Sequence, residues 1–209
     1  CVAKKFEAER PEHRMSNGTP YTDSVVTTRE LIWMIKCYGI DFVSLPDEAF
    51  DQPLGIATGA GDIFGTTGGV MEATLRTAAS WLAEGANEAV RLEFEEVRAV
   101  EGLREASIAI GGRLIHVGVA NGLTNAKTLL ERARTGQKEY HVLEIMACPG
   151  GCIGGGGQPY PTENWQVLDP ELLRQRAKAL YKEDGARGQR RSHENPALEI
   201  LYKEFLGEY

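Results

Sequence analysis

The stretch that decides both the fold and the chemistry of this chain is Met146-Ala-Cys148-Pro-Gly-Gly-Cys152-Ile-Gly-Gly-Gly-Gly-Gln158-Pro159. Two cysteines stand four residues apart, and the proline and glycines between them disfavour a helix. Glycines admit positive φ and let the backbone approach a bulky inorganic group closely. Thiolates are soft ligands that suit iron–sulfur clusters, and nearby peptide N–H groups can hydrogen-bond the cluster sulfurs. The stretch therefore predicts a cluster-binding loop.

Three other interpretations of this loop remain open. A zinc site would need a second pair of Cys or His residues at ligand spacing, and the four histidines of the chain are scattered singly. A redox disulfide usually has two residues between its cysteines, one fewer than here. A purely structural glycine turn would need no metal. Of the other cysteines, Cys1 is the credible third ligand, because Cys37 lies in an apolar helical pattern and is expected to be buried.

Outward from the loop, strand and helix patterns alternate along the chain. Strands are expected at residues 40–45, 92–100, 106–120 and 140–146, with a two-residue hairpin turn at Gly111-Gly112. Helices are expected at residues 27–38, 70–83 with a stop at Gly85, 124–135, 170–184 and 196–206, and residues 1–22 are expected to be irregular. This alternation predicts an α/β fold with a mixed or parallel sheet flanked by helices.

Composition sets the broad class of the protein. The chain has 209 residues, 42% apolar and 25% charged, which suits one globular domain or two small lobes. The net charge of -7 argues against nucleic acid as a partner. The basic run at residues 187–191 is expected to be a solvated loop, with a phosphate site as the alternative.

No apolar run is long enough for a membrane span, and no secretory leader is recognisable, although the chain starts at Cys1. The expected location is the cytoplasm, with the periplasm as the alternative.

A second glycine-rich stretch covers residues 55–69 and runs into a predicted helix. Such a stretch can cradle phosphate at a helix N-terminus. It lacks the Gly-Lys-Ser/Thr ending of a P-loop and the glycine spacing of a dinucleotide fingerprint. Close approach of this backbone to a cluster is the favoured role.

Several linked motifs resemble those of [FeFe]-hydrogenases, in the same order along the chain. Residues 146–159 resemble the last of the three cysteine motifs of that family, and Cys1-Val-Ala-Lys4-Lys5-Phe6-Glu7-Ala8-Glu9-Arg10 resembles the middle one. Between them, Phe50-Asp-Gln-Pro-Leu-Gly55 and the stretch from Thr58 to Ala73 are similar to the family. Ser192-His193-Glu194-Asn195-Pro196-Ala197 resembles its C-terminal region. The resemblance covers essentially all 209 residues.

The resemblance implies an H-cluster, in which a [4Fe–4S] cubane is joined through a cysteine sulfur to a diiron unit with CO, cyanide and a bridging dithiolate amine. It implies that Cys1 and Cys148 hold the cubane and that Cys152 holds it and bridges to the diiron unit. Lys4 would hydrogen-bond a cyanide, a charge-assisted contact, with Glu7 as its orienting partner. Apolar walls around the diiron unit would come from Phe64, Val70 and Met146; for these three, ordinary core packing is a compatible role.

The family's first cysteine motif, which supplies the fourth cubane ligand and a proton-passing cysteine, is not found in residues 1–209. We expect the chain to be the C-terminal part of the H-cluster domain, without that motif and without the family's C-terminal tail. An upstream lobe of the same polypeptide, or a second chain, would supply the missing ligand. Electrons would pass to further Fe–S domains or subunits, ferredoxin-like or NAD-linked.

The function implied is reversible interconversion of H2 with two protons and two electrons. Two rivals stay open: a non-catalytic relative that serves iron–sulfur cluster assembly, and a sensory relative that detects H2. The first rival is disfavoured by the stretch Gly61-Asp-Ile-Phe64-Gly, which such relatives are not expected to keep.

Overall fold

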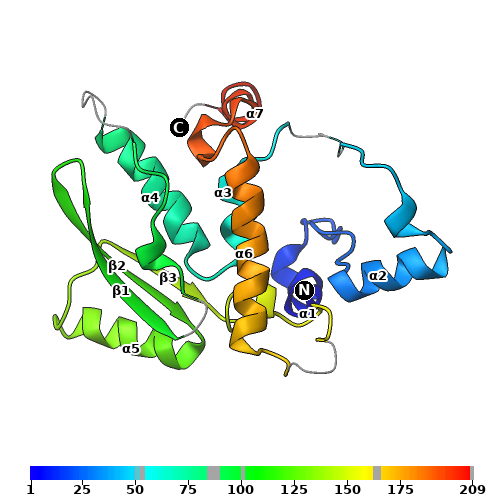
Figure 1. Ribbon diagram of the computed structural model, residues 1–209, viewed down its shortest axis with the longest axis horizontal. Helices are drawn as coiled ribbons and strands as arrows, with labels where there is room; N and C mark the ends of the chain where they lie inside the picture. Colours follow the sequence, from blue (N-terminus) through cyan, green and yellow to red (C-terminus); the bar gives the residue numbers. More distant parts are fainter. Residues whose placement is uncertain (50, 52–54, 84–89, 100–101, 162–165, 208–209) are drawn as a thin grey trace. The chain divides into compact units, whose positions relative to one another are not determined.

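The computed structural model describes residues 1–49, 51, 55–83, 90–99, 102–161 and 166–207 (Figure 1). The chain forms two compact units. The first combines Cys1–Phe50 with Gly154–Val167, and the second combines Asp51–Ile153 with Leu168–Tyr209. The family-like motif Phe50-Asp-Gln-Pro-Leu-Gly55 lies largely outside the described residues, and the predicted helix stop at Gly85 lies wholly outside them.

The first unit is built on two short helices, α1 (Val2–Glu9) and α2 (Thr28–Cys37). The helix α1 corrects the prediction of an irregular N-terminal stretch. The predicted helix at residues 27–38 is confirmed, and it begins with a capping box. The Thr27 side chain accepts from the amide of Glu30 at 3.2 Å, while the Glu30 carboxylate accepts from the amide of Thr27 at 2.8 Å. Two orphan N–H groups of the first turn are thereby satisfied.

Two predictions for this unit are wrong. The apolar run 40–45 forms a 3-10 turn, Phe42–Ser44, with exposed side chains, and no described strand of the first unit pairs with it. Cys37 is exposed and not buried, because α2 buries none of its residues. An apolar pattern on a helix predicts a buried face only where another element covers that face.

The second unit contains a three-stranded mixed sheet, in the order β1 (Leu103–Ile110), β2 (Arg113–Asn121) and β3 (Val142–Met146). The strands β1 and β2 form the predicted hairpin, in which Ile110 pairs with Arg113. Its turn residues Gly111 and Gly112 have φ of 54° and 73°, which a two-residue type I′ turn requires. The helix α5 (Leu123–Arg134) then connects β2 to the parallel strand β3. The α/β prediction is confirmed.

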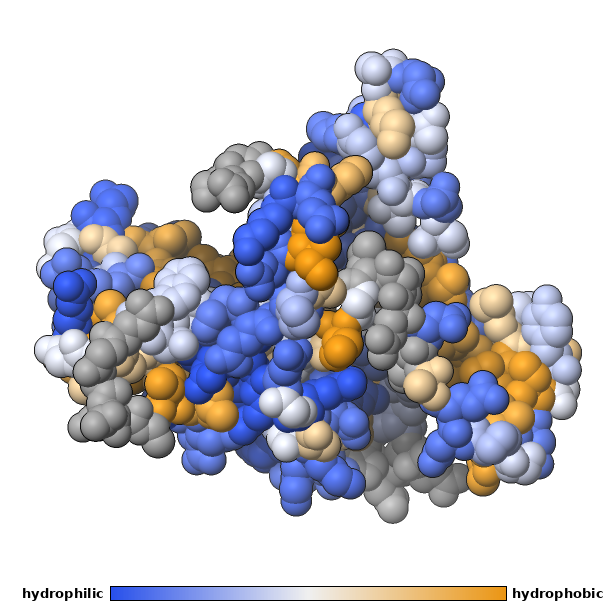
Figure 2. All heavy atoms as spheres, turned by 90° about the horizontal axis from the view of Figure 1, so that it is seen from above, coloured by the Kyte–Doolittle hydropathy of each residue, from blue (hydrophilic) through white to orange (hydrophobic). Residues whose placement is uncertain are grey.

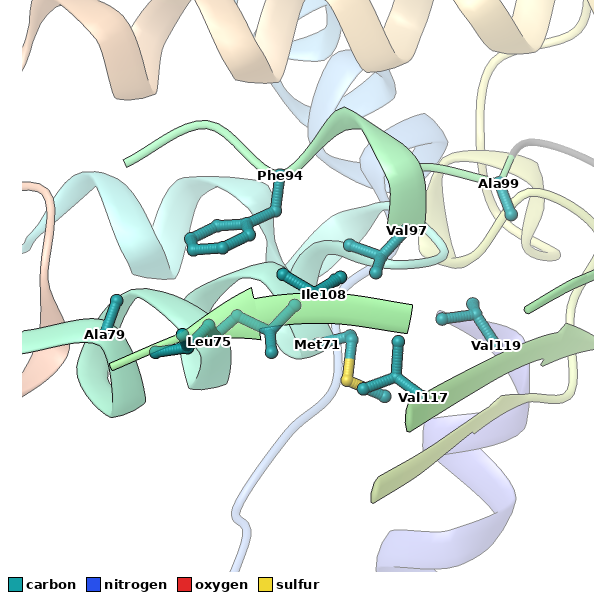
Figure 3. Close-up of a cluster of buried hydrophobic side chains, with 10 residues drawn as sticks. Met71, Leu75, Ala79, Phe94, Val97, Ala99, Ile108, Val117 and Val119 are labelled. Carbon is teal, nitrogen blue, oxygen red and sulfur yellow. The ribbon is translucent and has the colours of Figure 1, made fainter. Parts of the chain in front are cut away.

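Helices cover both faces of this sheet (Figure 1). On one face, side chains of α4 (Gly69–Leu82) join β1 and β2 in the main hydrophobic core, where Met71 and Leu75 meet Ile108, Val117 and Val119 (Figure 3). On the other face, a Cβ on Gly118 would lie 3.1 Å from Leu129 of α5, so this helix packs directly on the backbone of β2. The alternation of strand side chains thus places α4 and α5 on opposite faces.

The predicted strand 92–100 is wrong over its described residues. Phe94, Val97 and Ala99 do enter the core, but the segment is a loop with a 3-10 turn at Glu95–Val97 (Figure 3). Its backbone groups bond to α4 side chains and to a distant loop, not to a neighbouring strand. The carbonyl of Leu92 accepts from Arg76 at 2.7 Å, and the amide of Ala99 donates to the carbonyl of Thr67 at 3.2 Å.

The remaining helices pack beside the sheet layer. α3 (Gly59–Asp62) lies against α6 (Pro170–Ala186), so closely that a Cβ on Gly59 would meet Asp184. α6 begins as predicted, with Pro170 in the first turn and the Asp169 side chain as its cap. The predicted last helix divides into α7 (Pro196–Ile200) and a π-helical turn, Leu201–Leu206.

A buried ionic network ties α4 to α6. Arg76 is fully buried and donates to Asp184 at 2.8 Å and to Glu72 at 3.0 Å. Arg98 pairs with Glu72, and Arg190 pairs with Asp184. The basic run at residues 187–191 was predicted to be a solvated loop, but its Arg190 belongs to this buried network.

The surface is mostly hydrophilic on the face shown in Figure 2, with hydrophobic residues in separate patches. None of the described helices combines the length and apolar character that crossing a membrane requires.

Candidate metal centre

The cysteine loop leaves β3 directly. Cys148 follows the last strand residue, Met146, by two positions and is half-buried, while Cys152 is exposed and opens a 3-10 turn. Neither cysteine is part of a disulfide. Gly150 and Gly151 have φ of 74° and 95°, which is the positive-φ backbone expected from the sequence.

The loop lies against the second glycine-rich stretch. The amide of Thr67 donates to the carbonyl of Gly150 at 3.0 Å. A Cβ on Gly151 would lie 2.8 Å from both the carbonyl oxygen of Gly65 and the amide nitrogen of Thr67, so only glycine fits here. Two motifs that are distant in the sequence are thus in direct backbone contact.

A third anchor holds the far end of the loop. Ile153, next to Cys152, is buried with Leu173 and Ala177 of α6. The Arg176 guanidinium also donates to the carbonyl of Ile153 at 2.8 Å. The two cysteines are therefore carried by a segment that is fixed to β3, to the stretch 65–67 and to α6.

The predicted wall residues are in the same unit. Phe64 and Val70 line one open pocket of about 340 Å³, together with α4 side chains such as Ala73 and Trp81. Met146 is half-buried at the end of β3 and does not line this pocket. Phe64 and Val70 thus line the same pocket, and Thr67, which contacts the cysteine loop, lies between them in the sequence.

Beneath this contact, a buried carboxylate that the sequence analysis did not select joins β3 to α4. The two oxygens of Glu144 accept from the amides of Gly68 and Met71, each at 2.6 Å. Burial raises the pKa of Glu144, and the two amide bonds act in the opposite direction. In the sequence, Glu144 could have been selected because it is an acidic residue in the middle of an apolar strand pattern.

The other predicted site residues lie in the first unit. Cys1 is the exposed N-cap of α1, and the next amide, that of Val2, donates to the carbonyl of Gly156 at 3.0 Å. Gly156 and Gly157 belong to the four-glycine run that begins two residues after Cys152. A Cβ on Gly157 would lie 3.7 Å from the Cα of Cys1 and 2.7 Å from Thr27, so this run packs closely at the start of α1.

Lys4 and Glu7 form an ion pair one turn apart on α1. The Lys4 ammonium holds the pKa of the Glu7 carboxylate below its ordinary value. The structure thus brings together the two residues that the sequence analysis paired, both on the partly exposed surface of the helix.

The loop suits an iron–sulfur cluster on two observations. Cys148 and Cys152 flank a backbone that tolerates no Cβ at Gly151. The hydroxyl of Thr67 is buried beside this backbone without a hydrogen-bond partner, a donor that a cluster sulfur would satisfy. Within the described residues of either unit, no three Cys, His, Asp or Glu side chains gather to hold a metal ion by themselves. Further ligands are therefore needed beside Cys148 and Cys152.

Comparison with known families gives two matches. Residues 1–156 match the model of the iron-only hydrogenase large subunit, C-terminal domain. Residues 170–209 match the model of the iron hydrogenase small subunit. The first match alone covers more than half of the chain.

Individual relatives agree. The chain is 50% identical, over 99% of its length, to the NADP-reducing hydrogenase subunit HndD of Solidesulfovibrio fructosivorans, and 42% identical over 99% to iron hydrogenase 1 of Clostridium pasteurianum. A solved structure of a variant of the [FeFe]-hydrogenase HydA1 from Chlamydomonas reinhardtii matches the whole chain with a TM-score of 0.73 at 36% identity. Lower identity, 32%, links the chain to Protein NAR1 of Arabidopsis thaliana, and others at similar identity are named as cytosolic Fe–S cluster assembly factors.

The chain spans only part of each relative: 34% of HndD, 35% of the clostridial enzyme and 57% of the algal structure. Within that part, the mixed α/β fold agrees with the matched structures. The chain belongs to the iron-only hydrogenase family and corresponds to the C-terminal part of its large subunit.

Proposed function

We propose that this chain provides part of the catalytic site of an [FeFe]-hydrogenase. In this proposal Cys1, Cys148 and Cys152 would hold a [4Fe–4S] cluster, and Cys152 would serve both this cluster and a diiron unit with CO, cyanide and a dithiolate. When bound, this cofactor supplies the interconversion of H2 with two protons and two electrons.

One observation carries the proposal. The loop with Cys148 and Cys152 is hydrogen-bonded to the stretch that joins Phe64 to Val70, through the amide of Thr67. The segment that carries the soft ligands and the segment that carries the apolar side chains are thereby joined, which suits a metal cofactor that must be kept away from water.

The remaining residues have distinct tasks. Lys4 would donate to an anionic cyanide ligand, and Glu7 would hold its ammonium in place, because charge-assisted hydrogen bonds are strong and directional. Phe64, Val70 and Met146 would exclude water. The unpartnered hydroxyl of Thr67 would donate to a cluster sulfur.

In this proposal the fourth cysteine ligand comes from outside the 209 residues. We infer that this chain is the C-terminal part of an H-cluster domain, completed by an upstream lobe or by a second chain. The name of HndD, a subunit of an NADP-reducing hydrogenase, supports electron-transfer partners that carry Fe–S clusters and lead to a nicotinamide nucleotide. We infer a cytoplasmic location, with the periplasm as the alternative.

The test uses the completed domain after anaerobic maturation. Infrared bands of metal-bound CO and cyanide, together with H2 production, are expected in the wild type and are expected to vanish in Cys152→Ser. Cys37→Ser is the matched control, since Cys37 is an exposed cysteine without an assigned role, and it should keep both signals. Equal loss in both variants, or no bands in the wild type, would refute the proposal.

A second candidate function is iron–sulfur cluster assembly without H2 chemistry, which is supported by the similarity to NAR1. This candidate predicts a [4Fe–4S] electron paramagnetic resonance signal without CO or cyanide bands. A sensory hydrogenase would instead show the bands with very slow turnover. The same infrared and activity measurements therefore separate all three functions.

A further inference from the structure

Glu144 is placed unusually for a strand residue. It lies on the face of β3 that is turned toward α4, only 9% exposed, among strand neighbours that are mainly apolar. Its two carboxylate oxygens are used separately, one by the amide of Gly68 and the other by the amide of Met71. A carboxylate at a helix N-terminus satisfies orphan amides and interacts favourably with the helix dipole.

Two residues of the candidate metal centre lie next to these two amides in the sequence. Val70, a predicted pocket wall, lies between Gly68 and Met71. Thr67, immediately before Gly68, is the residue that holds the cysteine loop at Gly150. The carboxylate itself stands two residues before Met146 and four before Cys148, on the strand that leads into the loop. One side chain therefore connects both segments of the candidate centre.

We propose that Glu144 is a positioning residue for the metal centre. Its carboxylate holds the first turn of α4 on β3, and so sets where Val70 lies and where the Thr67–Gly150 contact meets the cysteine loop. The proposal rests on the proposed function for its metal, but its effect on the loop can be measured in the metal-free chain.

The alternative is that Glu144 only stabilises the fold, as any buried helix cap does. Asp184 provides the comparison, because it is a fully buried carboxylate of the same unit, bonded to Arg76 and Arg190 near the end of α6. Asp184→Asn also breaks a buried polar network, yet it leaves the contacts of Gly68 and Met71 untouched. Loss of stability alone cannot distinguish the two residues, whereas a change in the cysteine loop can.

The first measurement is site-resolved alkylation of the metal-free chain, followed by mass spectrometry. Glu144→Gln retains the shape but can accept only one of the two amides, and Glu144→Ala accepts neither. We expect Cys148, which is half-buried, to be alkylated several-fold faster in both variants, relative to the exposed Cys37 in the same molecules. Asp184→Asn should leave that ratio unchanged. If Glu144→Ala does not fold, Glu144→Gln carries the comparison.

The second measurement uses the completed, anaerobically matured domain. Glu144→Gln is expected to shift the infrared frequencies of the CO and cyanide bands, and Asp184→Asn is not. The positioning role is overturned if Glu144→Gln lowers thermal stability but changes neither the alkylation ratio nor the bands. A wild type without such bands would refute the hydrogenase function, while the alkylation ratio would still decide the role of Glu144.

Discussion

The amide of Thr67 and the carbonyl of Gly150 form a 3.0 Å hydrogen bond that joins the two glycine-rich motifs of this chain. The same stretch also bonds elsewhere, since the Thr67 carbonyl accepts from the amide of Ala99 and the amide of Gly68 donates to Glu144. The contact between the two motifs is therefore one part of a wider set of bonds around the cysteine loop.

Gly151→Ala should destabilise the second unit. Its φ of 95° is unfavourable for alanine, and the new Cβ would lie 2.8 Å from backbone atoms of Gly65 and Thr67. A cost of about 1–3 kcal/mol in the free energy of unfolding is expected from denaturant titration. Gly188→Ala is the control, because a Cβ there meets nothing within 4 Å, and it should change stability by less than about 0.5 kcal/mol. Equal effects would contradict the proposed close packing of the loop.

Thr66→Val and Thr67→Val should act in opposite directions in the metal-free chain. Both threonines are buried, but the Thr66 hydroxyl donates to the carbonyl of Ile63 at 2.9 Å, whereas the Thr67 hydroxyl has no partner. Removal of the first bond should cost about 1 kcal/mol, and removal of the second hydroxyl should be neutral or stabilising by a similar amount. Thermal unfolding of the two variants measures the contrast. A clear loss of stability in Thr67→Val would show that its hydroxyl is bonded after all.

Arg76→Met should be severely destabilising. The change leaves Asp184 with one cationic partner and removes a fully buried contact from Glu72. Breaking such a buried pair costs roughly 3–5 kcal/mol, which chemical denaturation would detect. Lys203→Met removes an exposed ion pair with Glu199 and should cost about 0.5 kcal/mol or less. A small effect of Arg76→Met would mean that the network is not formed in solution.

Glu30 should make the capping of α2 sensitive to acid. The Lys5 ammonium, followed by the amide and hydroxyl of Thr27, lowers the pKa of the Glu30 carboxylate from 4.5 to about 2. A lowered folded pKa gives stability that is fully present above the unfolded value of 4.5 and is lost as the pH falls toward 2. Nuclear magnetic resonance titration should therefore find the Glu30 midpoint near pH 2. Amide signals of α2 should follow it in the wild type but not in Glu30→Gln, and a midpoint near 4.5 would contradict the capping box.

Elements with strong local signals were predictable from the sequence. The Gly111-Gly112 turn, the Thr27 and Glu30 pair and the Asp169-Pro170 start each determine their own conformation within a few residues. The segment 92–100 was not predictable, because its backbone partners are Arg76, Glu72 and Thr67, which are distant in the sequence. Its alternating apolar pattern predicts correctly which side chains are buried, but it does not predict whether the backbone pairs with another strand.

The residues of the candidate centre also fall into those that the sequence identified and those that it missed. Cys148 and Cys152 were identified by their own spacing and glycine context, and the sequence also paired Lys4 with Glu7. Glu144 and Thr67 were missed, since their importance comes from what tertiary packing places beside them: two helix amides in one case and no partner in the other. The assignment of Cys1, Cys148 and Cys152 as cluster ligands stays a prediction.

The helices of the first unit bury none of their residues, and they are only 8 and 10 residues long. Helices of that length are marginal in water without tertiary support. A ligand that binds only the ordered form stabilises that form in proportion to its occupancy. With Cys1 as a metal ligand, iron delivery and the ordering of this unit become one coupled reaction. Iron starvation would then leave a chain with a formed sheet and an unravelled, protease-sensitive first unit.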